Sequence, residues 1–131
     1  MISKYLLLTI VPLVALTSCA TSYQQEGFFT NGYSDSRKSP DTFTVTFRAN
    51  EQTPPSKVMK YALKRAAELT LRNGFRYFAV IEEIQASSRQ KNKAHLHYPS
   101  VRLVIQCFHE HPFDKDAIDA RRFLGDFRSQ K

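Results

Sequence analysis

Glycine and cysteine are scarce in this chain of 131 residues, which contains four of the first and two of the second. The glycines form no glycine-rich loop of the kind that holds a phosphate. The two cysteines, Cys19 and Cys107, are too few for a disulfide framework. No serine lies in a G-x-S-x-G elbow, and spacing alone places no pair of carboxylates for acid–base catalysis. We therefore predict no catalytic residues, no bound cofactor and no enzymatic activity.

The chain also lacks an apolar run long enough to cross a membrane. Its longest such run, residues 5–16, is interrupted by Pro12 and is shorter than the roughly 20 residues that a spanning helix needs. Lys4 provides a positively charged start and small residues follow the run, which is the three-part pattern of a secretory signal. The pattern predicts that residues 1–18 are a signal peptide. The alternative is a short membrane anchor that stays uncut.

The end of this run, Leu16-Thr17-Ser18-Cys19, resembles the lipobox of bacterial lipoproteins, in which a signal peptidase cuts before a lipid-bearing cysteine. The resemblance implies that Cys19 carries a diacylglycerol thioether and acyl chains such as palmitate, which make the membrane a partner. One chain anchors a protein only marginally, so two or three are needed for stable attachment. Ala20 follows the cysteine, and similarity to Gram-negative lipoproteins with no aspartate there favours the outer membrane, with the domain facing the periplasm.

The chain is basic, with a formal net charge of +7. A basic cytosolic protein would suggest nucleic acid as a partner, but an exported lipoprotein meets little of it, so we expect no nucleic-acid partner. Anionic headgroups, an anionic glycan or another envelope protein fit better. The alternative is a solvated helix face whose charge has no dedicated ligand. The candidate basic surface lies on the polar side of a predicted helix and comprises Lys57, Lys60, Lys64, Arg65 and Arg72.

Residues 20–40 have the polar, glycine-containing composition of a flexible tether. Aromatic residues are unusual in such a linker, and here they either pack along the domain or lie among lipid headgroups. These aromatic residues are Tyr23, Phe28, Phe29 and Tyr33. The sequence thus divides into a lipoprotein signal peptide, a lipidated N-terminus with its tether, and one folded domain, at residues 1–18, 19–40 and 41–131.

The predicted domain opens with a strand and a helix. Apolar residues alternate with threonines over residues 42–47, which is the period of a half-buried strand. Over residues 58–72 apolar residues recur at helical spacing, with lysines and arginines on the opposite side. Glu68 lies toward the polar side of this helix, and we expect it to pair with Arg72, four residues further on.

The second half of the domain predicts two more strands and a second helix. Residues 75–84 favour a strand that is apolar on both faces up to Ile81, as in an interior strand, and residues 85–92 form a polar loop. A third strand at 101–108 has Cys107 on its apolar side, where we expect a buried thiol, and a second amphipathic helix spans 113–127. The order β-α-β-β-α predicts a single small α+β domain with both helices on one face of an antiparallel or mixed sheet.

Histidine pairs flank the third predicted strand. Residues two apart on a strand share a face, so His95 with His97, or His109 with His111, could bind Zn²⁺ or Cu²⁺. An extended strand would separate the two pairs by about 40 Å, so one chain could not join them on a metal. The weak metal candidates are therefore His109, Glu110 and His111, in a periplasmic metal-binding protein. The alternative is exposed histidines at strand ends, without a metal.

Several segments together resemble a family of small proteobacterial lipoproteins that has no assigned activity. They are GYSD at residues 32–35, TFTVTFRAN at 42–50, YALKRAAELT at 61–70 and NGFRYF at 73–78. The resemblance covers most of residues 19–84 and is weak beyond them. It implies the lipid anchor and adds no mechanism. Our leading hypothesis is a membrane-anchored envelope lipoprotein that acts as a non-enzymatic binding or structural module.

Overall fold

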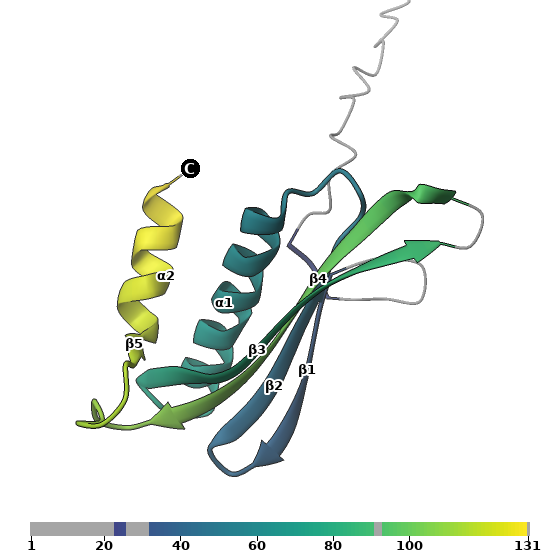
Figure 1. Cartoon of the computed structure of the whole chain (residues 1–131). Coiled ribbons are helices and arrows are strands. Elements are labelled where there is room, and N and C mark those ends of the chain that lie inside the picture. Colours follow the sequence, from purple (N-terminus) through teal and green to yellow (C-terminus); the bar gives the residue numbers. More distant parts are fainter. Residues whose placement is uncertain (1–22, 26–31, 91–92, 131) are drawn as a thin grey trace, which may run out of the picture.

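The computed structural model describes residues 23–25, 32–90 and 93–130, with side chains described for all of these except residues 87–97. The predicted signal peptide and Cys19 lie outside the described residues. The described elements are, in chain order, β1 (Gly32–Ser39), β2 (Thr42–Arg48), α1 (Pro55–Arg72), β3 (Tyr77–Gln90), β4 (Lys93–Phe108), β5 (Ile118–Asp119) and α2 (Ala120–Ser129) (Figure 1).

The strands form one antiparallel sheet in the order β1-β2-β4-β3-β5. β2 and β4 pair with Phe47 opposite Val101 and Val45 opposite Leu103, and all four side chains are buried. Because side chains alternate between the two faces of a strand, this register collects the apolar residues of both strands on one face. The threonines of β2 lie on the other face, as their alternation in the sequence predicts.

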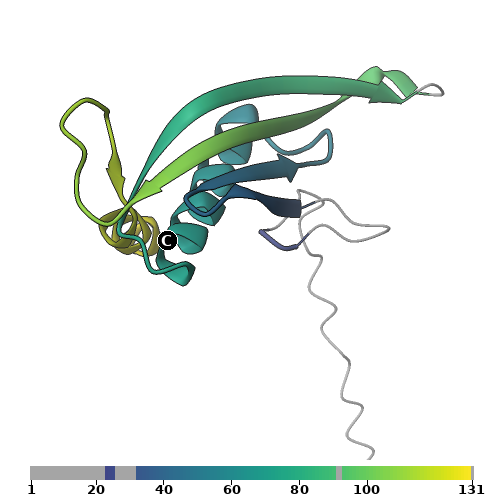
Figure 2. The same ribbon diagram turned by 90° about the horizontal axis from the view of Figure 1, so that it is seen from below.

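Both helices cover that apolar face, and Figure 2 shows the sheet as one layer with the helices beneath it. α1 places Val58, Ala62 and Ala66 against the strands, and all three are fully buried. Two of them are alanines, whose small side chains allow the helix to approach the sheet closely. α2 lies beside α1, where the rings of Phe127 and Tyr61 are 6.2 Å apart. The predicted α+β domain with two helices on one face of a sheet is confirmed.

The predicted tether is wrong in its second half. Gly32–Ser39 is not a flexible linker but strand β1, which pairs with β2 along its length. The folded domain therefore begins before residue 41, and residues 23–25 also contact it. Phe28 and Phe29 lie outside the described residues.

Three other boundaries differ from prediction. The third strand, β4, begins at Lys93 rather than at residue 101, so His95 and His97 lie within it and do not precede it. The polar loop at residues 85–92 is wrong, because β3 continues to Gln90 and forms a long two-stranded ribbon with β4. The second helix begins at Ala120 rather than at residue 113, and Phe113 is fully exposed in the connection before β5. Within the part of the chain that the structure describes, no helix is long and apolar enough to cross a membrane.

Candidate functional site

Residues 23–25, here called the N-terminal segment, lie across the middle of α1 and the start of β1. The ring of Tyr23 lies 4.9 Å from that of Tyr33, 5.6 Å from Tyr61 and 6.4 Å from Phe47, measured between centroids. Aromatic pairs at such separations contribute about 0.5–1.5 kcal/mol each beyond the area they bury. Tyr23 therefore joins the N-terminal segment to two strands and a helix at once.

The backbone of the N-terminal segment also pairs with β1. The amide of Tyr33 donates a hydrogen bond of 2.7 Å to the carbonyl oxygen of Gln24, and Gln25 forms a parallel bridge with Tyr33. Gly32 makes this approach sterically feasible. A Cβ at that position would lie 2.1 Å from the Gln24 oxygen, and the φ of +154° is one that other residues rarely adopt.

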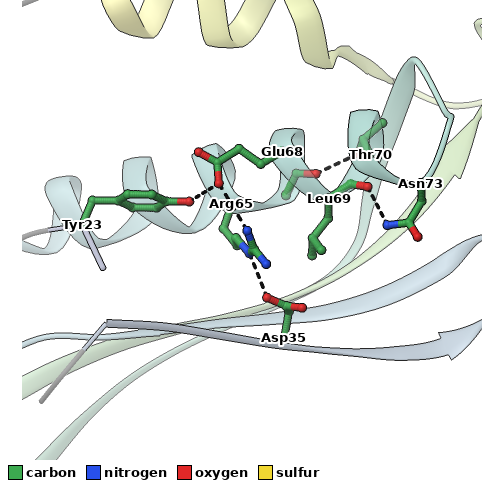
Figure 3. Close-up of polar contacts among 8 residues, drawn as sticks. Tyr23, Asp35, Arg65, Glu68, Leu69, Thr70 and Asn73 are labelled. Atoms are coloured by element: carbon green, nitrogen blue, oxygen red, sulfur yellow. Dashed lines mark hydrogen bonds and ion pairs between the residues drawn. The ribbon is translucent and has the colours of Figure 1, made fainter. Parts of the chain in front are cut away.

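A chain of polar contacts continues from Tyr23 across α1 to β1 (Figure 3). The Tyr23 hydroxyl donates to the Glu68 carboxylate. Arg65 Nη1 lies 3.4 Å from the same carboxylate, and Arg65 Nε donates to Asp35 at 2.8 Å. The Arg65 guanidinium also lies 4.4 Å from the centre of the Tyr33 ring, and its side chain is only 11% exposed. Each charge therefore has a partner of the opposite sign within a partly dry site.

Burial and hydrogen bonding determine the protonation states of Tyr23 and Arg65 in this group of polar contacts. Burial raises the pKa of Tyr23 strongly, and the hydrogen bond to Glu68 raises it further, so the phenol stays neutral. Burial alone would lower the pKa of Arg65, but the hydrogen bond and charge of Asp35 together raise it. The site thus places a neutral phenol beside a permanent cation.

Sequence reasoning only partly anticipated this site. Of the two alternatives for the aromatic residues, packing along the domain holds for Tyr23 and Tyr33, both of which lie against the core. The prediction that Glu68 pairs with Arg72 is wrong, because Glu68 contacts Arg65 and Tyr23 instead. The only signal for the missed contacts was the presence of tyrosines in an otherwise polar stretch.

The predicted basic surface separates into three parts. The Arg65 side chain takes part in the polar contacts, through its ion pair with Asp35, and Arg72 is exposed at the C-terminal end of α1. Lys57, Lys60 and Lys64, here called the lysine row, follow one stripe of α1. Their ammonium groups lie 5.5 Å from the Tyr61 ring, 5.2 Å from the Phe127 ring and 4.0 Å from the Tyr23 ring, respectively. The lysine row therefore borders the aromatic cluster that holds the N-terminal segment.

The metal candidates lie just after β4 and are all exposed. The His109 ring stacks on Phe75 at 4.6 Å, and His111 lies edge-on to Tyr77 at 5.4 Å. Across the described ranges, no group of three or more His, Cys, Asp or Glu side chains is arranged to hold a metal ion. The structure therefore supplies no observation in favour of the metal-binding alternative. The side chains of His95 and His97 are outside the described set.

A shallow hollow of about 350 Å³ lies between the start of α1 and the β3–β4 ribbon. Val58 and Val101 form its buried floor, and Glu51, Gln85 and Ser100 lie at its rim. Glu51 is its only charged lining residue, so the hollow offers no acid–base pair and no set of metal ligands. Its chemistry supports no particular ligand.

Comparisons of the chain with models of known protein families, with curated proteins and with solved structures each found no match. The resemblance to small lipoproteins therefore stays a prediction. Any function assigned to the chain rests on its own residues and on their arrangement in the fold.

Proposed function

We propose that this protein is a lipoprotein of the bacterial envelope, anchored in the outer membrane through acyl chains on Cys19. Its folded domain faces the periplasm and acts as a non-enzymatic binding or structural module. The partner is another envelope protein or an anionic glycan. The membrane is a second partner through the acyl chains.

The lipobox carries this proposal. Leu16-Thr17-Ser18-Cys19 follows a charged start and an apolar run that is too short to span a bilayer. The described domain supports it through spacing, because Tyr23 contacts the core only four residues after Cys19. An anchor at Cys19 would thus lead into folded protein almost directly, as expected of a module that works at a membrane surface.

Mass spectrometry of the protein from fractionated cells tests the anchor. We expect wild-type chains to begin at Cys19, to carry the mass of the lipid and to fractionate with the outer membrane. Cys19→Ala should carry no lipid and should leave that fraction. Cys107→Ala is the matched control, because it removes the other cysteine, which is buried in the core, and should leave lipidation intact. An uncleaved, unmodified wild-type chain in the cytosol would refute the proposal.

Crosslinking in intact cells tests the binding role. Recovery of the lipidated protein should bring down one reproducible envelope component, and the Cys19→Ala chain should lose that component along with its membrane location. Recovery of the lipidated protein alone, over crosslinkers of several lengths, would count against a binding module.

A further inference from the structure

We propose that the lysine row docks on anionic lipid headgroups of the membrane that holds Cys19, so that the domain lies on the bilayer in one orientation. This inference rests on the lipid anchor proposed above and adds a second, electrostatic contact to it. It concerns Lys57, Lys60 and Lys64 of α1, together with the tyrosine that lies against them.

The N-terminal segment determines how far the domain can move from the anchor. Tyr23 is four positions after Cys19, and a fully extended chain of that length reaches at most about 14 Å. If the tether ended at Gly32 instead, the extended reach would be about 45 Å. Because Tyr23 is held by Tyr33, Tyr61 and Glu68, the shorter reach applies, and the surface around Tyr23 is held close to the bilayer.

The surface that this reach holds near the bilayer is the lysine row. The Lys64 ammonium group lies 4.0 Å from the centre of the Tyr23 ring, and Lys60 and Lys57 follow one and two turns nearer the start of α1. α1 begins and α2 ends at the same end of the molecule (Figure 1). Tyr23, which is four positions after Cys19 in the sequence, and the three cations therefore lie on one side of the domain.

The chemistry of this surface suits a headgroup layer. A lysine near an anionic bilayer is attracted by the negative surface potential of the headgroups. The neighbouring rings of Tyr61 and Phe127 are half-buried, and Tyr61 combines an apolar ring with a polar hydroxyl, as interfacial aromatic residues do. Two acidic residues lie nearby, Glu68 one turn after Lys64 on α1 and Asp126 beside Lys60 on α2, and they reduce the attraction without reversing it. Lipid is favoured over a protein partner because the short reach from Cys19 presents this surface to the bilayer.

Energy transfer to labelled lipid tests the orientation. The chain beginning at Cys19 can be coupled to a maleimide lipid in vesicles, since the other thiol, Cys107, is buried. The sequence contains no tryptophan, so Ser56→Trp at the start of α1 and Phe113→Trp at the opposite end each provide a single donor. Dansyl-labelled phosphatidylethanolamine is the acceptor, in phosphatidylcholine alone or mixed in equal parts with phosphatidylglycerol.

We expect transfer from Ser56→Trp to exceed that from Phe113→Trp, and to rise when phosphatidylglycerol is present. The triple substitution Lys57→Gln, Lys60→Gln and Lys64→Gln should abolish that rise, whereas lysine-to-arginine substitution at the same positions should keep it. A control with the same change in charge replaces exposed cations elsewhere and should also keep the rise. Its substitutions are Lys38→Gln, Arg102→Gln and Arg121→Gln.

Equal transfer from the two tryptophans, or a rise that survives loss of the lysine row, would overturn the proposal. So would an equal loss in the control, because net charge alone would then explain the effect. Coupling through maleimide makes the outcome independent of lipidation in cells. Failure here therefore leaves the anchor untouched, whereas failure of the mass-spectrometric test would remove the bilayer on which this surface is proposed to dock.

Discussion

Arg65 joins parts of the chain that are distant in sequence. Its guanidinium group bonds to Asp35 of β1, contacts Glu68 on its own helix and lies over the Tyr33 ring. A planar guanidinium offers several donors in fixed directions, which a lysine ammonium does not. One residue therefore connects the edge strand, the helix and, through Glu68, the N-terminal segment.

Replacing Arg65 by methionine should destabilise the domain by about 1–3 kcal/mol, because two partly buried carboxylates then lose their cation. Urea unfolding measures the change. Arg65→Lys keeps the charge but loses the planar guanidinium group. Its free energy of unfolding should lie between those of the wild type and Arg65→Met. The double variant Asp35→Asn with Arg65→Met should recover part of the loss. A stability of Arg65→Met equal to that of the wild type would contradict the importance of this contact.

At the residue level, local spacing predicted some contacts and missed others. Cys107 is buried as expected, because it continues the alternation of Leu103 and Ile105 on β4. Glu68 is different, because its partners lie three residues before it and 45 residues away along the chain. A pairing rule based on neighbours within one helix turn includes Arg65 but cannot see a distant tyrosine that packs on the same face.

For the helices and strands, the pattern of buried residues decides whether an element can be predicted from the sequence. α1 is predictable because its buried residues recur every three or four positions. β1 carries GYSDSRKS, in which residues 35–38 are exposed on both faces, because the strand lies at the edge of the sheet. The outer part of the β3–β4 ribbon is equally polar, since its residues extend past the helices. Neither segment has the apolar alternation on which strand prediction depends.

The turn between β1 and β2 is held by Asp41, and its stability should depend on pH. The Asp41 carboxylate accepts hydrogen bonds from Ser39 at 2.9 Å, Thr42 at 3.1 Å and Gln106 at 3.3 Å. These bonds lower the pKa of Asp41, with that from Ser39 the strongest cause. A carboxylate with a lowered pKa in the folded state contributes stability above the unfolded value of about 3.9, and this is lost as the pH falls through the folded value.

Asp41→Asn should therefore lower the urea midpoint at neutral pH and flatten its decline below about pH 4. Asp114→Asn changes an exposed aspartate in the connection after β4 and should keep the wild-type acid dependence. Unfolding curves over a series of acidic buffers compare the three proteins. An unchanged acid decline in Asp41→Asn would show that another carboxylate controls it.

At the scale of the whole molecule, the N-terminal segment completes the domain. It covers the aromatic cluster between β1 and α1. Only residues 20–22 lie between this segment and Cys19 in the sequence. The sequence predicted the layers of the fold but not the binding of the N-terminal segment to the domain. That contact depends on residues of the segment, the first two strands and α1, which are far apart in the sequence and meet only in the folded state. Gly32 is the local feature that permits it, and it opens the GYS segment on which the family resemblance partly rests.

Hydrogen exchange at the Tyr33 amide should report whether the N-terminal segment is bound, because that amide donates to Gln24. Tyr23→Ala removes the half-buried ring, and exchange should become roughly 10-fold faster. Gly32→Ala should do the same by a different route, since its Cβ would collide with the Gln24 oxygen. Amides in the centre of β2 should keep their protection in both variants.

Two control variants separate release of the segment from general loosening of the fold. Tyr23→Phe keeps the ring and loses the hydroxyl bond to Glu68, so exchange at Tyr33 should change less than in Tyr23→Ala. Tyr77→Ala removes a half-buried ring from β3, away from the segment, and should leave Tyr33 protected. If Tyr33 exchanged at the wild-type rate in both Tyr23→Ala and Gly32→Ala, the segment would not be bound in solution, and the short reach from Cys19 would no longer hold.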